Sequence, residues 1–397
     1  MENETNHGLT SPSPLRGEGR DGGEASTSPA LSTVHTHPHP TSPLKGEEKT
    51  ESPPRNPSLF RRRFATFNRN RRARFSLWLL LGLFVVTLFA EAVANDKPIM
   101  VRYKGDLLFP ILFTYTEKDT FGGQLEGEAD YTDPWIENEI HTHGWMWMPP
   151  LRYNHLSVDF AAQRAPFKPT QEHWLGTDDQ GRDVLARVIY GFRLSLLFGF
   201  TLVGLSSIIG IALGAIQGYY GGWFDLLFQR FIEMWASVPM LFLLIILSSI
   251  VVPSFWWILA LMLLFKWMAL VDVVRAEFLR ARNFDYVRAA NALGVPERTI
   301  IFRHVLPNAL VPVFTFIPFL ITSAITLLAS LDFLGFGLPA GSPSLGEILQ
   351  QGKNNPQSPW LGLTGFFVLA LLLSLLIFIG EGVRDAFNPR KIQMGRA

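Results

Sequence analysis

Long apolar stretches constrain this chain more than any other feature of its sequence. A helix needs roughly 20 apolar residues to cross the hydrocarbon core of a bilayer, and six stretches approach or reach that length. A helix also satisfies its own backbone groups, as lipid requires. We therefore predict an all-α, polytopic membrane protein with six spans. The expected spans are Phe75–Ala94, Leu194–Gln217, Met234–Val252, Phe255–Val271, Ala309–Leu331 and Trp360–Gly380.

The charges between these stretches predict how the chain is oriented. Seven arginines and no acidic residue lie between Arg61 and Arg74, and arginine-rich segments stay in the cytoplasm. Residues 95–192 carry 9 basic and 15 acidic residues, whereas 272–308 carries six arginines and four acids. Six spans from a cytoplasmic start place 95–192 on the external, periplasmic side of the membrane, and 272–308 and both termini in the cytoplasm.

Composition divides the chain into five parts. Residues 1–60 are rich in Ser, Pro and Gly, and SPLRGEG at 13–19 returns as SPLKGEE at 42–48. We expect a disordered low-complexity tail there, and our hypothesis is that it is a leader without a role, from a misplaced start. The other parts are a basic anchor with the first span (61–94), a folded, Trp-containing periplasmic segment (95–192), a core with spans two to six (193–383) and a cytoplasmic tail (384–397).

Several chemistries are excluded by what the sequence lacks. The chain has no cysteine, and so no disulfide framework, thiolate nucleophile or Cys metal site. It also has no G-x-x-x-x-G-K-[ST] phosphate-binding loop, so ATP hydrolysis by that chemistry is excluded. We expect a non-catalytic subunit without a bound cofactor or metal and without a nucleic-acid partner.

The charged stretch Asp285–Asn308 lies between the fourth and fifth expected spans and is too polar for lipid. Tyr286–Leu293 is a run of helix formers that Gly294 ends. Pro296 suits the first turn of a second helix, which we expect to run until Pro307. An ordinary basic loop is the alternative interpretation. A small, smooth helix side that fits a partner's groove is formed by Ala289, Ala290 and Ala292.

A second polar motif precedes the second span and reads HWLGTDDQGRDVLARVIYGFRLS from His173 to Ser195. Its three aspartates suggest a magnesium site of the kind used by membrane enzymes on lipid diphosphates. A second acidic cluster is missing, however, and Arg182 lies among the carboxylates. The alternative is structural: Gly176 and Gly181 fit turns, and Asp183 pairs with Arg187 at i,i+4 as a helix begins. The other two aspartates are Asp178 and Asp179.

Inside the spans, three features carry expectations. Pro239 is expected to kink or unwind the third span. Glycines in the second span, with Gly204 beside Ser207, are expected to let helices approach closely. Lys266 and Glu91 are ionisable groups in or near lipid. They support an alternative function, an ion-coupled secondary transporter, although inverted repeats are not visible.

The charged stretch resembles the EAA loop of ABC importer permeases, in which two alanines, a glycine and a Leu-Pro pair recur. Here these residues are Ala289, Ala290, Gly294, Leu306 and Pro307. Arg288 stands where the family usually has Glu, and His304 where many members have Ile. His is common in the peptide-transporting branch, so Arg288 is the departure that puts the docking charges in doubt.

Further motifs in the same order resemble the C-type permeases of dipeptide and oligopeptide importers. They include GTDDQGRD, GYYGGW, LDFLGFGLP and SLGEIL, and the resemblance extends over about 174–390. The family turn motif corresponds to Gly176, Asp178, Asp179, Gly181, Arg182 and Asp183.

The resemblance implies a type I ABC importer permease fold, a location in the bacterial inner membrane and a set of partners. These are a second permease subunit, ABC ATPase subunits that bind ATP and Mg, a periplasmic peptide-binding protein and the lipid bilayer. The implied substrates are oligopeptides or microcin C-like peptides, and no substrate-binding residue is assigned. The implied ATPase-coupling residues are Tyr286, Arg288, Ala289, Ala290, Leu293, Gly294, His304, Leu306 and Pro307.

Overall fold

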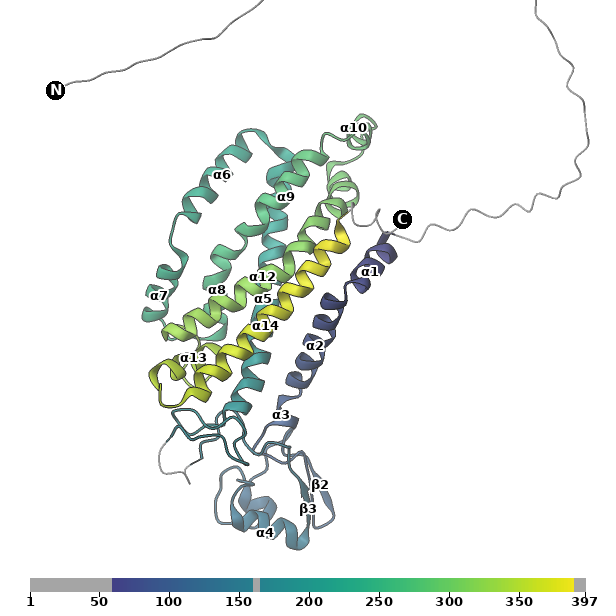
Figure 1. The fold of residues 1–397 in the computed structure, drawn as a ribbon. Helices are drawn as coiled ribbons and strands as arrows, with labels where there is room; N and C mark the ends of the chain where they lie inside the picture. The colour runs from purple at the N-terminus through teal and green to yellow at the C-terminus, as the bar shows by residue number, and fades with distance from the viewer. Residues whose placement is uncertain (1–58, 160–164, 389–397) are drawn as a thin grey trace, which may run out of the picture. The chain divides into compact units, whose positions relative to one another are not determined.

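A computed structural model of the chain describes residues 59–159 and 165–388. The expected low-complexity tail therefore lies outside the described residues except at its last two positions, as does most of the expected C-terminal tail. The described chain is mostly helical (Figure 1). Its longer helices are α1 Leu59–Arg69, α2 Arg71–Leu88, α4 Pro134–His143, α5 Val184–Tyr220, α6 Gly222–Ala236, α7 Met240–Ile250, α8 Phe255–Lys266, α9 Met268–Ala281, α10 Asp285–Ala292, α12 Leu306–Leu334, α13 Leu345–Asn354 and α14 Pro359–Phe387. Shorter helical segments are α3 Ala90–Val93, α11 Glu297–Thr299 and the π-helices η1 Glu117–Phe121 and η2 Ile300–Val305.

The segment between the first two expected spans contains a small sheet, so the all-α prediction is wrong there. Its antiparallel strands, in the order β2-β1-β3, are β1 Met100–Tyr103, β2 Asp106–Leu108 and β3 Gly144–Trp147. Positive φ values at Lys104 (48°) and Gly105 (100°) give the tight turn that joins β1 to β2. Helix α4 packs on this sheet, and Ile136 and Ile140 enter a core shared with Val101.

Four helices are long and apolar enough to cross a membrane, and a bent pair makes up to five candidates among the described residues. By helix length and composition, four or five of the six expected spans qualify as candidate membrane spans among the described residues. The first expected span forms α2 and α3, which are separated at Phe89. Arginines at 71, 72 and 74 lie inside the 18 residues of α2. These charges exclude α2 from the helices that qualify as candidate membrane spans.

The third expected span is broken into the bent pair α6 and α7. Residues 237–239 separate the two helices, which meet at 66°. Pro239 precedes the first residue of α7 and has no N–H to donate to a preceding turn. Because α7 has only 11 residues, it is about 16 Å long, short of the roughly 30 Å hydrocarbon core.

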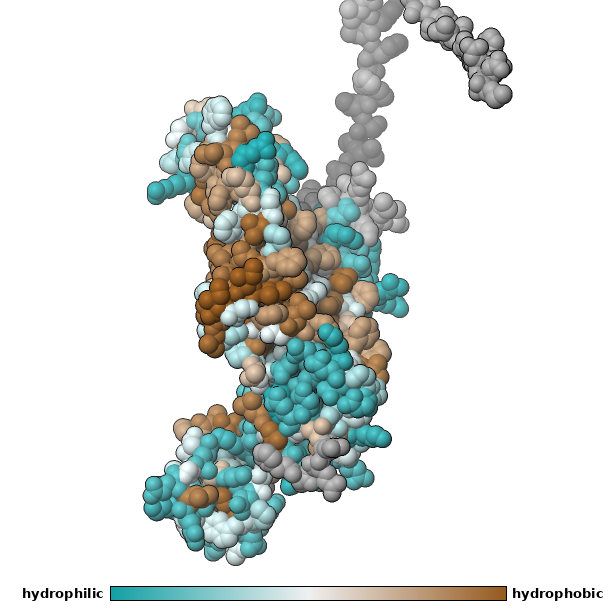
Figure 2. All heavy atoms as spheres, turned by 90° about the vertical axis from the view of Figure 1, so that its left-hand side faces the viewer, coloured by the Kyte–Doolittle hydropathy of each residue, from teal (hydrophilic) through white to brown (hydrophobic). Residues whose placement is uncertain are grey.

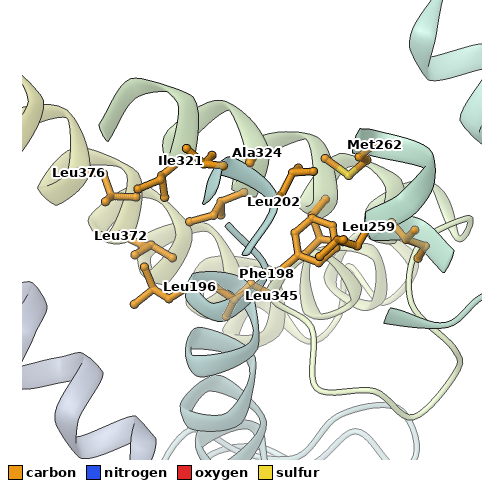
Figure 3. Close-up of a cluster of buried hydrophobic side chains, with 14 of the residues drawn as sticks. Leu196, Phe198, Leu202, Leu259, Met262, Ile321, Ala324, Leu345, Leu372 and Leu376 are labelled. Carbon is orange, nitrogen blue, oxygen red and sulfur yellow. The ribbon is translucent and has the colours of Figure 1, made fainter. Parts of the chain in front are cut away.

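Helix α5 lies at the centre of the bundle and packs against α9, α12 and α8. The largest buried cluster joins α5 with α8, α12, α13 and α14 through aliphatic and aromatic side chains. Figure 3 shows Phe198 and Leu202 of α5 among residues of the neighbouring helices. Helix α2 packs mainly against α14, on the outside of this arrangement (Figure 1).

Three glycines let α5 approach α9 at backbone distance. A Cβ added at Gly210, Gly214 or Gly218 would lie 2.5 to 2.7 Å from a carbonyl oxygen of α9 or the residue before it. The spacing of four keeps the three glycines on one helix face. The expectation for Gly204 is not met within this chain, because no atom of the described residues lies within 4 Å of a Cβ built there. The facing carbonyl oxygens belong to Trp267, Val271 and Arg275.

Hydrophobic side chains gather between two hydrophilic ends on the face shown in Figure 2. Exposed apolar residues of α6 and α7 include Leu227 and Ile250. Such a broad exposed apolar surface is expected of a protein surrounded by lipid or by another membrane subunit.

The contact between α5 and α9 generates a first prediction. Gly214→Ala places a methyl group 2.7 Å from a carbonyl oxygen, and we expect overpacking to lower the free energy of unfolding by about 1–3 kcal/mol. The measurement is chemical unfolding of the detergent-solubilised chain, followed by tryptophan fluorescence. Gly204→Ala is the matched control and should change stability by less than about 0.5 kcal/mol. Equal effects of the two variants would contradict the assigned helix contact.

Candidate functional site

Helix α10 and its C-terminal turn form the centre of the predicted coupling loop. Gly294 has φ +74°, the left-handed conformation that ends many helices. The Gly294 N–H donates to the Asn291 carbonyl (3.0 Å), and the Val295 N–H donates to the Ala290 carbonyl (3.1 Å). This pair of bonds is a Schellman motif. Ala290 and Val295 also pack against one buried cluster, which contains Val287 of the same helix. Ala290 and Gly294 therefore define how the helix ends.

Val287 is the most deeply buried side chain that attaches α10 to the bundle, and the opposite side of the helix is open. Val287 is fully buried with Phe278 of α9 and Val305 of η2. Tyr286 is 43% exposed and Leu293 is 83% exposed. Arg288 and Ala289 are exposed as well. The helix therefore has a rigid attachment and an outward surface that combines aromatic, aliphatic and basic groups.

The second helix of the predicted loop does not stop at Pro307. Helical structure runs from Glu297 through α11 and η2 into α12, so 297–334 forms one path of 38 residues. Pro307 occupies the first turn of α12, where a missing N–H disrupts no bond of that helix. Leu306 and His304 are partly buried. The loop is thus joined directly to the fifth expected span without a break.

An ion pair supports the base of this region. Arg275 of α9 donates from Nη2 to the Asp225 carboxylate of α6 at 2.7 Å. The Tyr220 hydroxyl lies 3.4 Å from the Glu297 carboxylate at the start of α11. The first contact joins α9 to α6, and the second joins the end of α5 to α11.

The turn motif before α5 forms a buried network of charges. Asp178 accepts from the backbone N–H groups of Gln180 and Arg182, each at 2.9 Å. Its other oxygen accepts from Arg182 Nε at 2.7 Å. Gly176 and Gly181 have φ values of +75° and +84°, which permit the tight turns around this carboxylate.

Two buried arginines connect the turn motif to α13. Arg182 and Arg187 donate to the two carboxylate oxygens of Glu347, at 3.2 Å and 2.8 Å. Arg187 is fully buried and also donates to the Ser342 carbonyl at 3.0 Å. The expected Asp183–Arg187 pair is wrong, because Asp183 caps α5 by accepting from the Ala186 N–H at 2.7 Å.

His173 links the charge network to Asp159, in the segment that precedes α5. Its Nδ1 lies 2.8 Å from Asp183 Oδ2, and its Nε2 lies 3.2 Å from Asp159 Oδ2. The hydrogen bond to Asp183 raises the pKa of His173, and the bond to Asp159 acts in the same direction. The imidazole thus joins 159, 173 and 183 most strongly when it is protonated.

The two alternative chemistries receive no support from the geometry. Across residues 59–159 and 165–388, no three His, Cys, Asp or Glu side chains converge to hold a metal ion, and Asp178 is occupied by arginine. Glu91 accepts from Arg193 Nη2 at 2.8 Å. Lys266 donates to Ser323 at 2.8 Å. Both ionisable candidates for ion coupling therefore have a partner.

Sequence reasoning missed three members of the charge network: Glu347, Gln351 and His173. Gln351 is buried and donates towards Glu347 at 3.3 Å. Glu347 and the arginines lie about 160 positions apart, so no local spacing connects them. Charge was the available signal, because Glu347 is one of two acidic residues in 332–359 and buried arginines need acidic partners.

Comparison with known proteins places these features in a family. The family model described as "Binding-protein-dependent transport system inner membrane component" matches residues 210–393, which include α10 and its turn. The chain belongs to this family of ABC transporter permeases.

Individual relatives extend the match over most of the chain. The "Inner membrane ABC transporter permease protein YejE" of Escherichia coli is 58% identical over 83% of this chain and 96% of its own. The "Peptidoglycan transport system permease protein YejE" of Agrobacterium fabrum is 53% identical over 83% of this chain and 93% of its own. The "Oligopeptide transport system permease protein OppC" of Haemophilus influenzae is 38% identical over 62% and 78%. The resemblance to peptide-branch ABC permeases is confirmed.

The arginine–carboxylate network yields a second prediction. Arg187→Met leaves Glu347 without one of its two arginines, and removing one partner of a buried ion pair costs about 3–5 kcal/mol of unfolding free energy. Because the penalty comes from the orphaned charge, adding Glu347→Leu should recover part of it. Arg230→Gln is the control, since Arg230 is exposed and its pair is worth about 0–1 kcal/mol. Strictly additive single effects would contradict the network.

A third prediction concerns pH. The raised pKa of His173 means that its protonated form stabilises the fold below the ordinary value of 6.5. This contribution disappears as the pH rises through the raised pKa. We expect the unfolding temperature of the native chain, relative to His173→Gln, to fall across that window. Parallel pH profiles of the two proteins would refute the imidazolium contribution.

Proposed function

We propose that this chain is a membrane-spanning permease subunit of an ATP-driven importer that takes up peptides. Its membership of the permease family supports the transport role. The peptide substrate is proposed from the names of relatives, which refer to oligopeptide transport in one case and peptidoglycan transport in another. Peptides of the oligopeptide or microcin C type are the proposed substrates.

The exposed side of α10 is the proposed docking surface for an ABC ATPase, and this observation carries the functional proposal. Leu293 and Tyr286 present apolar area, as buried anchors of protein interfaces do. Val287 holds the helix against α9 and η2, so a push on α10 reaches the bundle. ATP and Mg would be bound by the ATPase, which supplies the hydrolysis.

The proposed topology has six spans in the bacterial inner membrane. In it α2 and α3 form the first span and the bent α6–α7 pair forms the third. The arginines before and in α2 and those around α10 support a cytoplasmic location for the two termini and the coupling loop. The small sheet and α4 then belong to a periplasmic insertion, at the end of the bundle opposite α10 in Figure 1.

A complete transporter requires further subunits. We propose a second, related permease subunit beside this chain and a periplasmic peptide-binding protein at the insertion. The broad apolar surface of α6 and α7 suits contact with lipid or with that second permease. The acidic balance of 95–192 suits the delivery of cationic peptides. Movement of α10 would pass to α12 through the Val287 contact and the turn at Gly294.

The ion-coupled alternative rests on Lys266 and Glu91. Lys266 is bonded to Ser323 and Glu91 to Arg193, and no relative above is named as an ion-coupled transporter. The two classes of transporter are separated by measuring whether uptake depends on ATP, as in an ABC importer, or on a proton gradient, as in an ion-coupled transporter.

Docking of the ATPase is the fourth prediction. Leu293→Asp puts a charge where an interface would remove water, and we expect recovery of co-expressed ATPase in a detergent pull-down to fall at least about tenfold. Leu293 is 83% exposed, so the fold should tolerate this change. Leu112→Asp is the matched control, because Leu112 is 73% exposed in the insertion. Equal recovery with both variants would contradict docking through α10.

A further inference from the structure

Lys266 lies deep within a candidate membrane span. The span is the helical path Phe255–Ala281, which α8 and α9 form together and which has 27 residues. At 1.5 Å per residue, Lys266 is about 16 Å from one end of this path and about 22 Å from the other. The hydrocarbon core is roughly 30 Å thick, so the residue lies at membrane depth. A charge at that depth is costly unless it is paired or faces water.

The side chain that holds Lys266 is neutral. Lys266 Nζ donates to the Ser323 hydroxyl of α12 at 2.8 Å. Among the described residues, no charged side chain is close enough to interact with this ammonium group. Asp272 lies six positions further along the helix, about 9 Å along its axis, and accepts from Gln229 Nε2 of α6 at 3.4 Å. The charge of Lys266 is therefore not neutralised by any described residue.

The surface around Lys266 is formed by polar and small side chains. Between 317 and 331, the exposed side chains of α12 are Ser323 and Thr326. Between 268 and 279, those of α9 are two alanines and Asp272. Helix α12 packs against α9, so these exposed residues belong to neighbouring helices. We name as the polar strip the residues Lys266, Asp272, Ser323 and Thr326.

Other apolar helices expose large hydrophobic side chains instead. Phe242, Ile246 and Ile250 of α7 are all more than half exposed, as are Phe366 and Phe367 of α14. Such surfaces suit contact with lipid tails. Hydroxyl and charged groups do not, because hydrocarbon offers them no hydrogen-bond partner. The polar strip is therefore expected to face water or a polar molecule within the membrane.

We propose that the polar strip lines the passage by which a peptide crosses the membrane, and that the Lys266 ammonium group binds the peptide carboxylate there. This inference rests on the proposed function. An ammonium group and a carboxylate form a charge-assisted hydrogen bond, which is about twice as strong as a neutral one. A lipid phosphate is the wrong size of reach, since phosphates lie outside the roughly 30 Å hydrocarbon core.

Recognition of the carboxylate suits a passage that admits many peptides. Side chains differ from one peptide to the next, whereas each linear peptide ends in the same carboxylate. The hydroxyls of Ser323 and Thr326 donate and accept hydrogen bonds, as contact with a peptide backbone requires. Lys266 is a single cation on a flexible stem, so it can bind an anion without closing around it. Passage needs such binding, favourable enough for entry and weak enough for release.

The absence of cysteine lets one introduced thiol report on the polar strip. Thr326→Cys places a thiol one helical turn from Ser323, with about 5–6 Å between the Cβ atoms. We would label it in membrane fragments from cells that express the whole transporter, with sulfonatoethyl or trimethylammonioethyl methanethiosulfonate. Relative to the rates of the two reagents with free cysteine in buffer, we expect the anionic reagent to be favoured about tenfold. Unreacted thiol is counted after purification of the chain.

Three matched variants control this experiment. Lys266→Met should abolish the preference for the anionic reagent, and Lys266→Arg should keep it, because arginine retains the charge. Phe367→Cys, at a position of α14 that is 62% exposed, should react with neither charged reagent if it faces lipid. Thr326→Cys as unreactive as Phe367→Cys would refute the passage. A reactive thiol without the anionic preference would refute the free ammonium group, as would neutralisation of Lys266 by an acidic side chain of the second permease.

Peptides then test the ligand. Trialanine and N-acetyl-trialanine carry the terminal carboxylate and should slow the anionic labelling of Thr326→Cys, whereas trialanine amide should not. In a Lys266→Met background, the same protection from the cationic reagent should need about tenfold more trialanine. Equal protection by trialanine and its amide, or protection unchanged by Lys266→Met, would overturn carboxylate recognition.

A pull-down of the ATPase from the same membrane fragments separates this inference from the proposed function. If the ATPase is recovered but the anionic preference is absent, only the Lys266 site is refuted. If no ATPase is recovered even by the native chain, the proposed function fails.

Discussion

The buried contact of Arg182 and Arg187 with Asp178 and Glu347 is the interaction on which this end of the protein depends. Burying four charges is costly unless each is paired, and here each has an opposite charge within 3.5 Å. The network joins the start of α5 to α13, and α5 is the helix that the other helices surround. One set of ion pairs therefore holds the turn motif and the start of the central helix against α13.

The membrane character and the family followed from sequence because both have local signals. Apolar length predicts helices, and the spacing of Ala290 and Gly294 depends on one helix end, whose Schellman bonds involve both residues. The contact between α5 and α9 was less predictable. The sequence pattern indicated Gly204, but the glycines of α5 that face carbonyl oxygens are those at 210, 214 and 218, and that choice depends on where the partner helix lies.

Other errors have equally physical causes. The sheet in the insertion has strands of three or four residues, too short for a clear alternation of polar and apolar residues. The expected Asp183–Arg187 pair obeyed helix spacing, but Asp183 was needed as a cap and Arg187 as the partner of Glu347. Six apolar stretches became four or five candidates for two reasons. Three arginines in the 18 residues of α2 remove this helix from the candidates, and a break at residues 237–239 divides the third stretch into two short helices.

The helical path from Glu297 to Leu334 has a mechanical consequence. It starts beside the attachment of α10, and near its other end Asp332 accepts a hydrogen bond from Ser344, the residue that caps α13. A stiff rod of this kind would transmit a displacement along its whole length at once. Pro307, Pro312 and Pro318 each lack the N–H that the bonding ladder of this path requires, so they are the points where such a rod would flex. How much of a push at one membrane face arrives at the other then depends on the compliance of three prolines.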